Sequence, residues 1–240
     1  MCIMKIPEKA FYVNPKSIQN KIFSLCEKES YHAVKVLRLK LGDTIVLVDG
    51  KSHGYLGLIE QIKPKVITGS IKKTLKNFGE NHNTLHISPG LFKKNRFEIL
   101  LEKATELGVK EIHPILMERS VKTSINIDRC NKILISAAKQ CRRSFFPILH
   151  RPKDLHTLLN TSEGCKYYAC HLNADLTLFS YKSTLTYPSN VIIGPEGGFS
   201  KTEIDIMKNR GVSFFHLGKR RLRAETAAIS SITLFNELGI

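Results

Sequence analysis

The sequence lacks any run of about eighteen apolar residues, so no segment is expected to span a membrane. Residues 1–7 also lack the long apolar core of a secretory signal. There are six cysteines but no Cys-x-x-Cys spacing, which excludes the usual zinc-ribbon and thioredoxin-like motifs. We therefore expect a cytoplasmic protein whose cysteines are reduced and mostly buried.

No metal site is expected either. His82 and His86 stand four residues apart, but the residues between them do not form a helical pattern, so the two side chains are not predicted to share a face. Hydrophobic residues make up 42% of the chain, which is enough for a packed core in one large domain or two smaller ones.

Acidic residues are few relative to basic ones. The chain has 37 Lys and Arg against 21 Asp and Glu, a net charge of +16. Residues 1–78 carry 14 basic and 6 acidic side chains, so this third alone has half of the net charge. The balance favours a polyanion as partner, nucleic acid first and an acidic membrane surface second. No basic amphipathic helix of adequate length supports binding to a membrane surface. The remaining alternative is a general enrichment in lysine, in which case the charge would not indicate any binding partner.

The first 73 residues form a β-rich pattern. Short β-branched runs over 44–48, 54–59 and 66–71 predict strands, and residues 30–37 predict one short helix. Such strands at close spacing indicate a small barrel or curled sheet. The polar stretch 72–83 is predicted to be a linker.

From residue 84 the pattern alternates between strands and helices. Strands are predicted over 84–88, 112–116, 167–172, 191–193 and 212–217. Asp128 is expected to cap one helix, and Ser200 with Glu203 has the spacing of a capping box. Gly108 and Gly211 are placed to end helices. The alternation predicts an α/β domain with a mainly parallel sheet covered on both faces.

Two loops near the carboxyl end carry the strongest functional signal. Residues 193–199 are rich in glycine, and residues 217–226 are rich in arginine; each loop follows a predicted strand and precedes a predicted helix. Because the carboxyl ends of neighbouring parallel strands form a ligand-binding crevice, the pair predicts a site for a polar ligand beside an anion. Neither loop has a dinucleotide or P-loop signature. A tight turn without ligand, and a solvated basic face, are the alternatives that these patterns leave open.

The order of these loops resembles the cofactor-binding region of the ribosomal RNA uridine-N3 methyltransferases of the SPOUT superfamily. Residues 103–109 with Pro114 and 118–120, and residues 137–142 with Pro147, are similar to two further blocks of that family. Residues 32–38 with Gly42, Asp43 and 49–50 resemble its PUA-like RNA-binding domain. The resemblance covers nearly the whole chain. It implies a PUA-like β-barrel domain over 1–73 and a SPOUT domain with a trefoil knot over 80–240.

The resemblance also implies S-adenosylmethionine as methyl donor and methylation of a uridine N3 in small-subunit (16S) ribosomal RNA. A homodimer acting on ribosomal RNA or on the small ribosomal subunit is expected. Carried over position by position, the cofactor-binding residues are expected to be His171, Leu172, Ile193, Gly194, Pro195, Glu196, Gly197, Gly198, Leu217, Gly218, Leu222 and Thr226.

Arg223 is the expected catalytic residue, since it would face the developing uracil oxyanion or a flanking phosphate, and Glu225 is a weaker candidate for the base. RNA contacts are expected from Arg38, Lys93, Lys94, Arg142 and Arg220. Lys139 and Arg221 depart from the family pattern and are expected to add positive charge near the RNA. Another SPOUT methyltransferase with a different target position, or an RNA-binding assembly factor without catalysis, remain alternatives.

Overall fold

The computed structural model describes residues 7, 10–161 and 164–239. The chain divides into two compact units. The first unit comprises Met1–Glu80 with Ile135–Phe146, and the second comprises Asn81–Leu134 with Pro147–Ile240. The helix α3 (Ile127–Gln140) therefore begins in the second unit and ends in the first.

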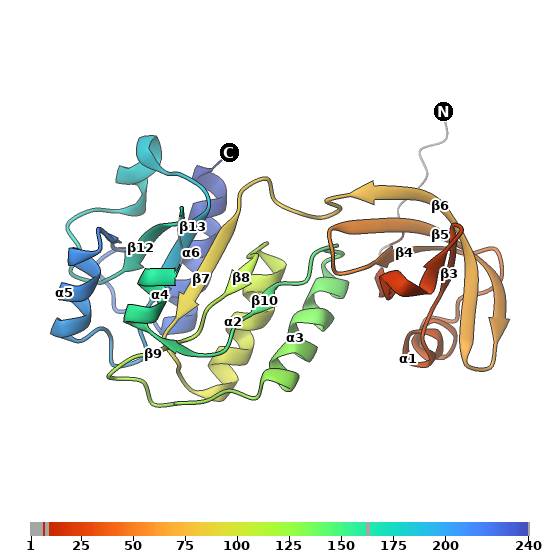
Figure 1. The fold of residues 1–240 in the computed structure, drawn as a ribbon, viewed down its shortest axis with the longest axis horizontal. Coiled ribbons are helices and arrows are strands. Elements are labelled where there is room, and N and C mark those ends of the chain that lie inside the picture. Colours follow the sequence, from red (N-terminus) through yellow and green to blue (C-terminus); the bar gives the residue numbers. More distant parts are fainter. Residues whose placement is uncertain (1–6, 8–9, 162–163, 240) are drawn as a thin grey trace. The chain divides into compact units, whose positions relative to one another are not determined.

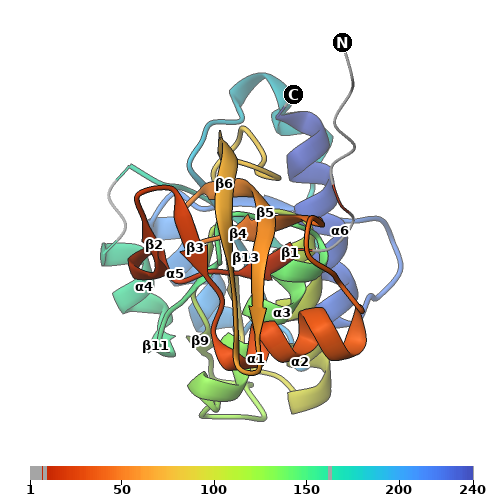
Figure 2. The same ribbon diagram turned by 90° about the vertical axis from the view of Figure 1, so that its right-hand side faces the viewer.

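The first unit contains a six-stranded sheet (Figure 2). Its strands, in sheet order, are β1 (Ala10–Tyr12), β4 (Thr44–Val48), β5 (His53–Lys63), β6 (Val66–Lys76), β3 (Ile22–Ser24) and β2 (Ile18–Gln19). Only the β1–β4 pair is parallel. The predicted strands are confirmed, but β6 continues to Lys76, so the prediction of a linker from residue 72 was wrong over its first five residues.

The helical segment of this unit differs from the prediction over 30–37. It begins at Glu27 as α1 (Glu27–Tyr31) and continues as a π-helical turn, η2 (His32–Val36). A short 3₁₀ turn, η1 (Pro15–Ser17), joins β1 to β2.

Two glycines allow the β5–β6 hairpin to close over Phe23. A Cβ on Gly57 would stand 2.7 Å from the Phe23 ring, and one on Gly69 would stand 1.9 Å from the Leu58 carbonyl oxygen. Phe23 is fully buried, and the register of the hairpin shifts twice along its length. Bulges of this kind curl a sheet, so the glycines and the bulges together shape the core of the first unit.

The second unit is built on a parallel sheet (Figure 1). Its order is β10 (Ile148–Leu149), β8 (Glu111–Ile112), β7 (Leu85–Pro89), β13 (Ser189–Ile193), β12 (Lys166–Cys170) and β14 (Ser213–Phe215). Every pair is parallel, as predicted. The single strand predicted over 112–116 was wrong: it is divided into β8 and β9 (Ile115–Leu116), and β9 pairs with β11 (Lys153–Asp154).

Helices cover both faces of this sheet, as predicted. Tyr168, Val191 and Ile193 face a core that includes residues of α2 (Lys94–Glu106), of the first part of α3 and of α6 (Ala224–Leu238), with η3 (Leu178–Thr184) beside it. Tyr167, Ala169 and Ile192 point to the opposite face, where α4 (Leu155–Thr161) and α5 (Lys201–Asn209) pack. The alternation of side chains along β12 and β13 thus fixes a three-layer arrangement.

The predicted helix signals were mostly correct. Ser200 and Glu203 form the capping box at the start of α5, and Gly108 and Gly211 follow α2 and α5 with positive φ angles. The expectation that Asp128 caps α3 was wrong. Asn126 Oδ1 accepts the hydrogen bond from Arg129 N at 2.9 Å, and Asp128 lies in the first turn instead.

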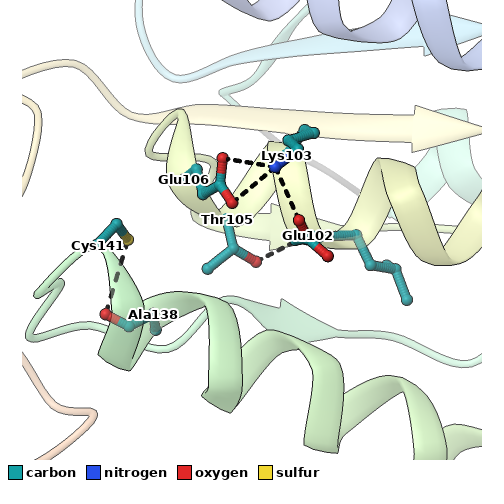
Figure 3. Close-up of polar contacts among 7 residues, drawn as sticks. Glu102, Lys103, Thr105, Glu106, Ala138 and Cys141 are labelled. Carbon is teal, nitrogen blue, oxygen red and sulfur yellow. Dashed lines mark hydrogen bonds and ion pairs between the residues drawn. The ribbon is translucent and has the colours of Figure 1, made fainter.

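The family-like block at the end of α2 has local structural contacts (Figure 3). Lys103 Nζ lies 2.7 Å from Glu102 Oε1 and 2.9 Å from Glu106 Oε1, and the Thr105 hydroxyl donates to the Leu101 carbonyl at 2.7 Å. The Lys103–Glu106 pair joins residues three positions apart and stabilises the last turn of α2.

The cysteines are less buried than predicted. All five described cysteines are free thiols, which agrees with the prediction, but only Cys130 is buried and Cys26 is exposed. Cys2 lies outside the described residues. Within the described part of the chain, no helix combines the length and apolarity needed to cross a bilayer.

Candidate functional site

A cavity of about 530 Å³ lies in the second unit, where β12, β13 and β14 end. All of the predicted cofactor-binding residues except Thr226 line it: His171, Leu172, Ile193, Gly194, Pro195, Glu196, Gly197, Gly198, Leu217, Gly218 and Leu222. The structure therefore brings the two predicted loops together with a third, after β12. The volume of the cavity is within the range of small-molecule binding sites.

The glycine-rich loop is a tight turn that leaves space in front of its backbone. Gly198 N donates to the Pro195 carbonyl at 2.8 Å, and Gly198 has a φ of +70°. Gly218 in the second loop has a φ of +100°. Nothing lies within 4 Å of the position that a Cβ would take on either residue. A ligand could therefore approach both backbones closely.

Arginine side chains hold these loops through backbone carbonyls. Arg119 Nη1 donates to the carbonyls of Gly197 and Phe199, both at 3.2 Å. Arg221 Nη2 donates to the Glu196 carbonyl at 3.1 Å, which ties the arginine-rich loop to the glycine-rich loop. Arg221 was expected only to add positive charge near the RNA, and this contact with the glycine-rich loop was not predicted.

Arg96 connects two carboxylates at the cavity. Its Nη1 lies 3.6 Å from Glu196 Oε1, and its Nε lies 3.6 Å from Glu225 Oε1. The other carboxylate oxygens of Glu196 and Glu225 are buried without a hydrogen bond. Glu225 does not line the cavity, whereas Arg96 does. The expected base thus lies behind Arg96, a residue that no local pattern singled out as part of this site.

Arg223 and Thr226 stand at the start of α6. Arg223 is the N-cap residue of this helix, its side chain is exposed and makes no capping hydrogen bond, and it lines the cavity. Thr226 is exposed and does not line it. The α6 amino terminus contributes positive potential here, so the position of Arg223 favours an anion.

The predicted RNA-contact residues have different surroundings. In the second unit, Lys93 and Lys94 are exposed at the start of α2, and Arg220 is exposed and lines the cavity. In the first unit, Arg38 is exposed, whereas Arg142 Nη1 donates to the Pro7 carbonyl at 3.3 Å.

Lys139 does not add a free positive charge. Its Nζ lies 2.6 Å from Glu29 Oε1, and the two side chains are 18% and 7% exposed. The expectation that this position increases the charge of an RNA-binding face was therefore wrong, because Glu29 neutralises it.

Burial shifts the pKa of two residues that line the cavity, His171 and Cys170. Burial, and secondarily the charge of Lys208, lowers the pKa of His171, which keeps its imidazole neutral at pH 7. Burial raises the pKa of the Cys170 thiol to about 11. The cavity wall after β12 is thus uncharged, and the positive charge comes from the arginines.

Comparison with known proteins identifies the family. The model of the RNA methyltransferase domain family matches residues 79–236. The chain belongs to this family. A second model, the RNA methyltransferase PUA domain, matches residues 25–72. This confirms the expected α/β methyltransferase domain and the PUA-like domain that precedes it.

Relatives in this RNA methyltransferase family match over nearly their whole length. The chain is 29% identical to a ribosomal RNA small subunit methyltransferase E of Rickettsia conorii, over 95% of both chains. It is 30% identical to the protein of that name from Buchnera aphidicola, over 95% of this chain and 92% of the relative. A protein from Legionella pneumophila, solved in complex with the cofactor SAM, is 27% identical with a TM-score of 0.84, over 97% of this chain and 98% of that one.

Proposed function

We propose that this protein transfers a methyl group from S-adenosylmethionine to N3 of a uridine in small-subunit ribosomal RNA. The observation that carries the proposal is the single cavity in which the glycine-rich loop, the arginine-rich loop and the loop after β12 meet. Family membership and full-length relatives that are named small-subunit ribosomal RNA methyltransferases support it.

The residues of the cavity fit such a donor. Ile193, Leu217 and Leu222 offer apolar surface for an adenine ring, and the open backbone at Gly198 and Gly218 accepts close contact. When bound, S-adenosylmethionine supplies a methyl group on a positively charged sulfur. The chain's own task is to position the uracil and to manage its proton.

The uracil N3 is a poor nucleophile until its proton leaves, and the resulting negative charge spreads onto the flanking carbonyl oxygens. A guanidinium at the amino end of α6 would stabilise that charge by forked hydrogen bonds, and Arg223 has this position. The Arg96–Glu196–Glu225 contacts would hold the loops around the base in one geometry. We therefore assign Arg223 to charge stabilisation and Arg96 to positioning.

RNA recognition is assigned to the first unit together with the exposed basic residues Lys93, Lys94 and Arg220. The first unit contains the PUA match and the densest positive charge of the sequence, with Arg38 exposed. Phosphate contacts of this kind position RNA, while an unstacked base is presented to the cavity. We also propose a cytoplasmic location, where such a substrate is found.

Two measurements test the function. Calorimetry is expected to show one S-adenosylmethionine site per chain. Gly198→Val should weaken donor binding at least tenfold, because the new side chain would be strained at this positive φ and would project into the open space of the cavity. Gly211→Val is the matched control, since Gly211 has nearly the same φ of +69° but lies outside the cavity. Mass mapping of small-subunit RNA from cells with and without the protein is expected to find one N3-methyluridine that depends on it.

Other outcomes of the same experiments are decisive. Donor binding without any missing methyl group would indicate an assembly factor that does not catalyse. A missing 2′-O-methyl group, or a missing methyl group on another base, would indicate a different RNA methyltransferase. Loss of donor binding in Gly211→Val as well as in Gly198→Val would contradict the assignment of this cavity as the donor site.

We further propose a homodimer and a trefoil knot, as the family resemblance implies. Leu172, Leu176 and Phe179 are exposed on the segment beside the cavity, and a second subunit would cover such apolar side chains. Light scattering on the purified protein is expected to give twice the chain mass of 27.1 kDa. A monomer at micromolar concentration would contradict the dimer.

A further inference from the structure

A cluster of histidine and glutamate side chains lies on the second unit's sheet, apart from the cavity. His86 on β7 pairs in register with Glu111 on β8, and His113 follows two residues later. Because side chains alternate along a strand, all three project from the same face. One ligand atom from each lies within 4.8 Å of the others. None of the three lines the cavity described above.

The polar atoms of His113 are not satisfied by the protein. The side chain is buried, at 5% exposure, and neither ring nitrogen makes a hydrogen bond, although Nε2 lies 3.3 Å from Glu111 Oε2. A neutral imidazole has one donor and one acceptor, and buried polar atoms without partners are rare in native proteins. An unmet lone pair beside a carboxylate and a second imidazole is the arrangement that a cation would complete.

The protonation states suit a cation. His86 is partly buried and His113 is buried, and burial disfavours the charged form of an imidazole, which leaves a lone pair free for an ion. Metal ions bind neutral histidine and ionised carboxylate. The Lys153 ammonium also acts on His113 and opposes a cation, so a site of moderate affinity is expected.

His150 supports Glu111 from outside the cluster. Its Nε2 lies 2.7 Å from Glu111 Oε2, and its ring stacks on that of His113 at 4.1 Å with an angle of 10°. Two nearly parallel rings at this separation cannot both point a lone pair at one ion about 2 Å away. His150 is therefore placed to orient the carboxylate, as the outer partners of metal ligands commonly do.

We propose that His86, Glu111 and His113 form a binding site for one divalent transition-metal ion, with Zn²⁺ as the preferred ion. Two imidazoles and one carboxylate suit Zn²⁺, whereas Mg²⁺ and Ca²⁺ prefer oxygen ligands alone. Three protein ligands leave the fourth tetrahedral position to water. Because β7, β8 and the residue that follows β8 supply the ligands, the ion would stabilise this half of the parallel sheet. The sequence predicted no such site, since His86 and Glu111 are 25 positions apart.

The test uses the full-length protein, without an affinity tag and treated with a chelator. Zinc chloride is titrated by calorimetry, and the metal content is measured after gel filtration. We expect one Zn²⁺ per chain for the unmodified protein and at least tenfold weaker binding for His86→Gln and Glu111→Gln. His82→Gln is the matched control, because His82 is an exposed histidine four residues away and outside the cluster.

Thermal unfolding provides the second readout. Zn²⁺ is expected to raise the melting temperature of the unmodified protein and of His82→Gln, but not of His86→Gln. Absence of stoichiometric binding, equal binding by all variants, or loss of binding in His82→Gln would each overturn the proposal. If Glu111→Gln fails to fold, His86→Gln decides alone. Neither readout requires methyl transfer, so the metal site and the proposed function can fail independently.

Discussion

Replacing Arg223 with alanine is expected to lower methyl-transfer turnover by about 10²–10³-fold, the usual cost of removing one donor to a developing oxyanion. Affinity for S-adenosylmethionine should change by less than about threefold, because the loss concerns charge that develops on the uracil. The helix should remain intact, since the Arg223 side chain makes no capping hydrogen bond. Single-turnover kinetics with saturating donor and RNA measure the effect.

Two further variants separate this role from general charge. Arg223→Lys keeps the positive charge but not the forked geometry, so we expect it to recover only part of the rate. Lys219→Ala removes a neighbouring exposed charge that does not line the cavity, and it should leave turnover unchanged. An equal loss of turnover and donor affinity in Arg223→Ala would contradict the assignment of Arg223 to the transition state.

The two loops of the site could be predicted because their signals are local. Residues 193–199 are a short glycine-rich stretch and residues 217–226 a short arginine-rich stretch, and each follows an apolar strand. In a parallel sheet the carboxyl ends of strands lie at one edge, so β13 and β14 had to bring these loops to the same side. The capping box at Ser200 was predictable for the same reason, since all of its atoms lie within one helical turn.

The residues that hold the loops could not be predicted in this way. Arg119 reaches the Gly197 carbonyl across 78 positions, and Arg96 lies in a different helix from Glu225. The Lys139–Glu29 pair of the first unit, which does not hold the loops, likewise joins residues 110 positions apart. Such contacts depend on tertiary geometry and on backbone acceptors, which have no sequence pattern of their own. The sequence therefore predicted the residues that line the cavity better than the residues that hold its loops in place.

The predicted end of β6 and the predicted cap of α3 were wrong for a related reason. The last residues of β6, from Lys72 to Lys76, are mostly polar and exposed, and Leu75 is the one apolar side chain among them that packs against a core, so the sequence has little hydrophobic signal for a strand here. At α3, Asn126 and Asp128 are both good caps, and only the backbone path decides that Asn126 takes the role.

Replacing Glu80 with alanine is expected to destabilise the first unit by about 3–5 kcal/mol, since it removes the carboxylate that pairs with the buried Arg143 guanidinium. Glu80 Oε2 lies 2.9 Å from Arg143 Nη2, and Glu80 Oε1 accepts from Phe145 N at 3.0 Å. Both charged side chains are 2% exposed. Hydrogen exchange of the β4–β6 amides, followed by mass spectrometry, measures the loss in this unit separately from the second.

The double variant Glu80→Leu with Arg143→Met decides whether the charges or the packing matter. A buried ion pair often contributes little net stability over apolar residues of similar size, because removing two charges from water offsets their attraction. We therefore expect the double variant to regain most of the stability that Glu80→Ala loses. If the double variant is instead the less stable one, the pair itself stabilises the unit, through the hydrogen bonds that join residue 80 to the segment after α3. If Glu80→Ala costs less than about 1 kcal/mol, water reaches Arg143 and the pair is not buried in solution.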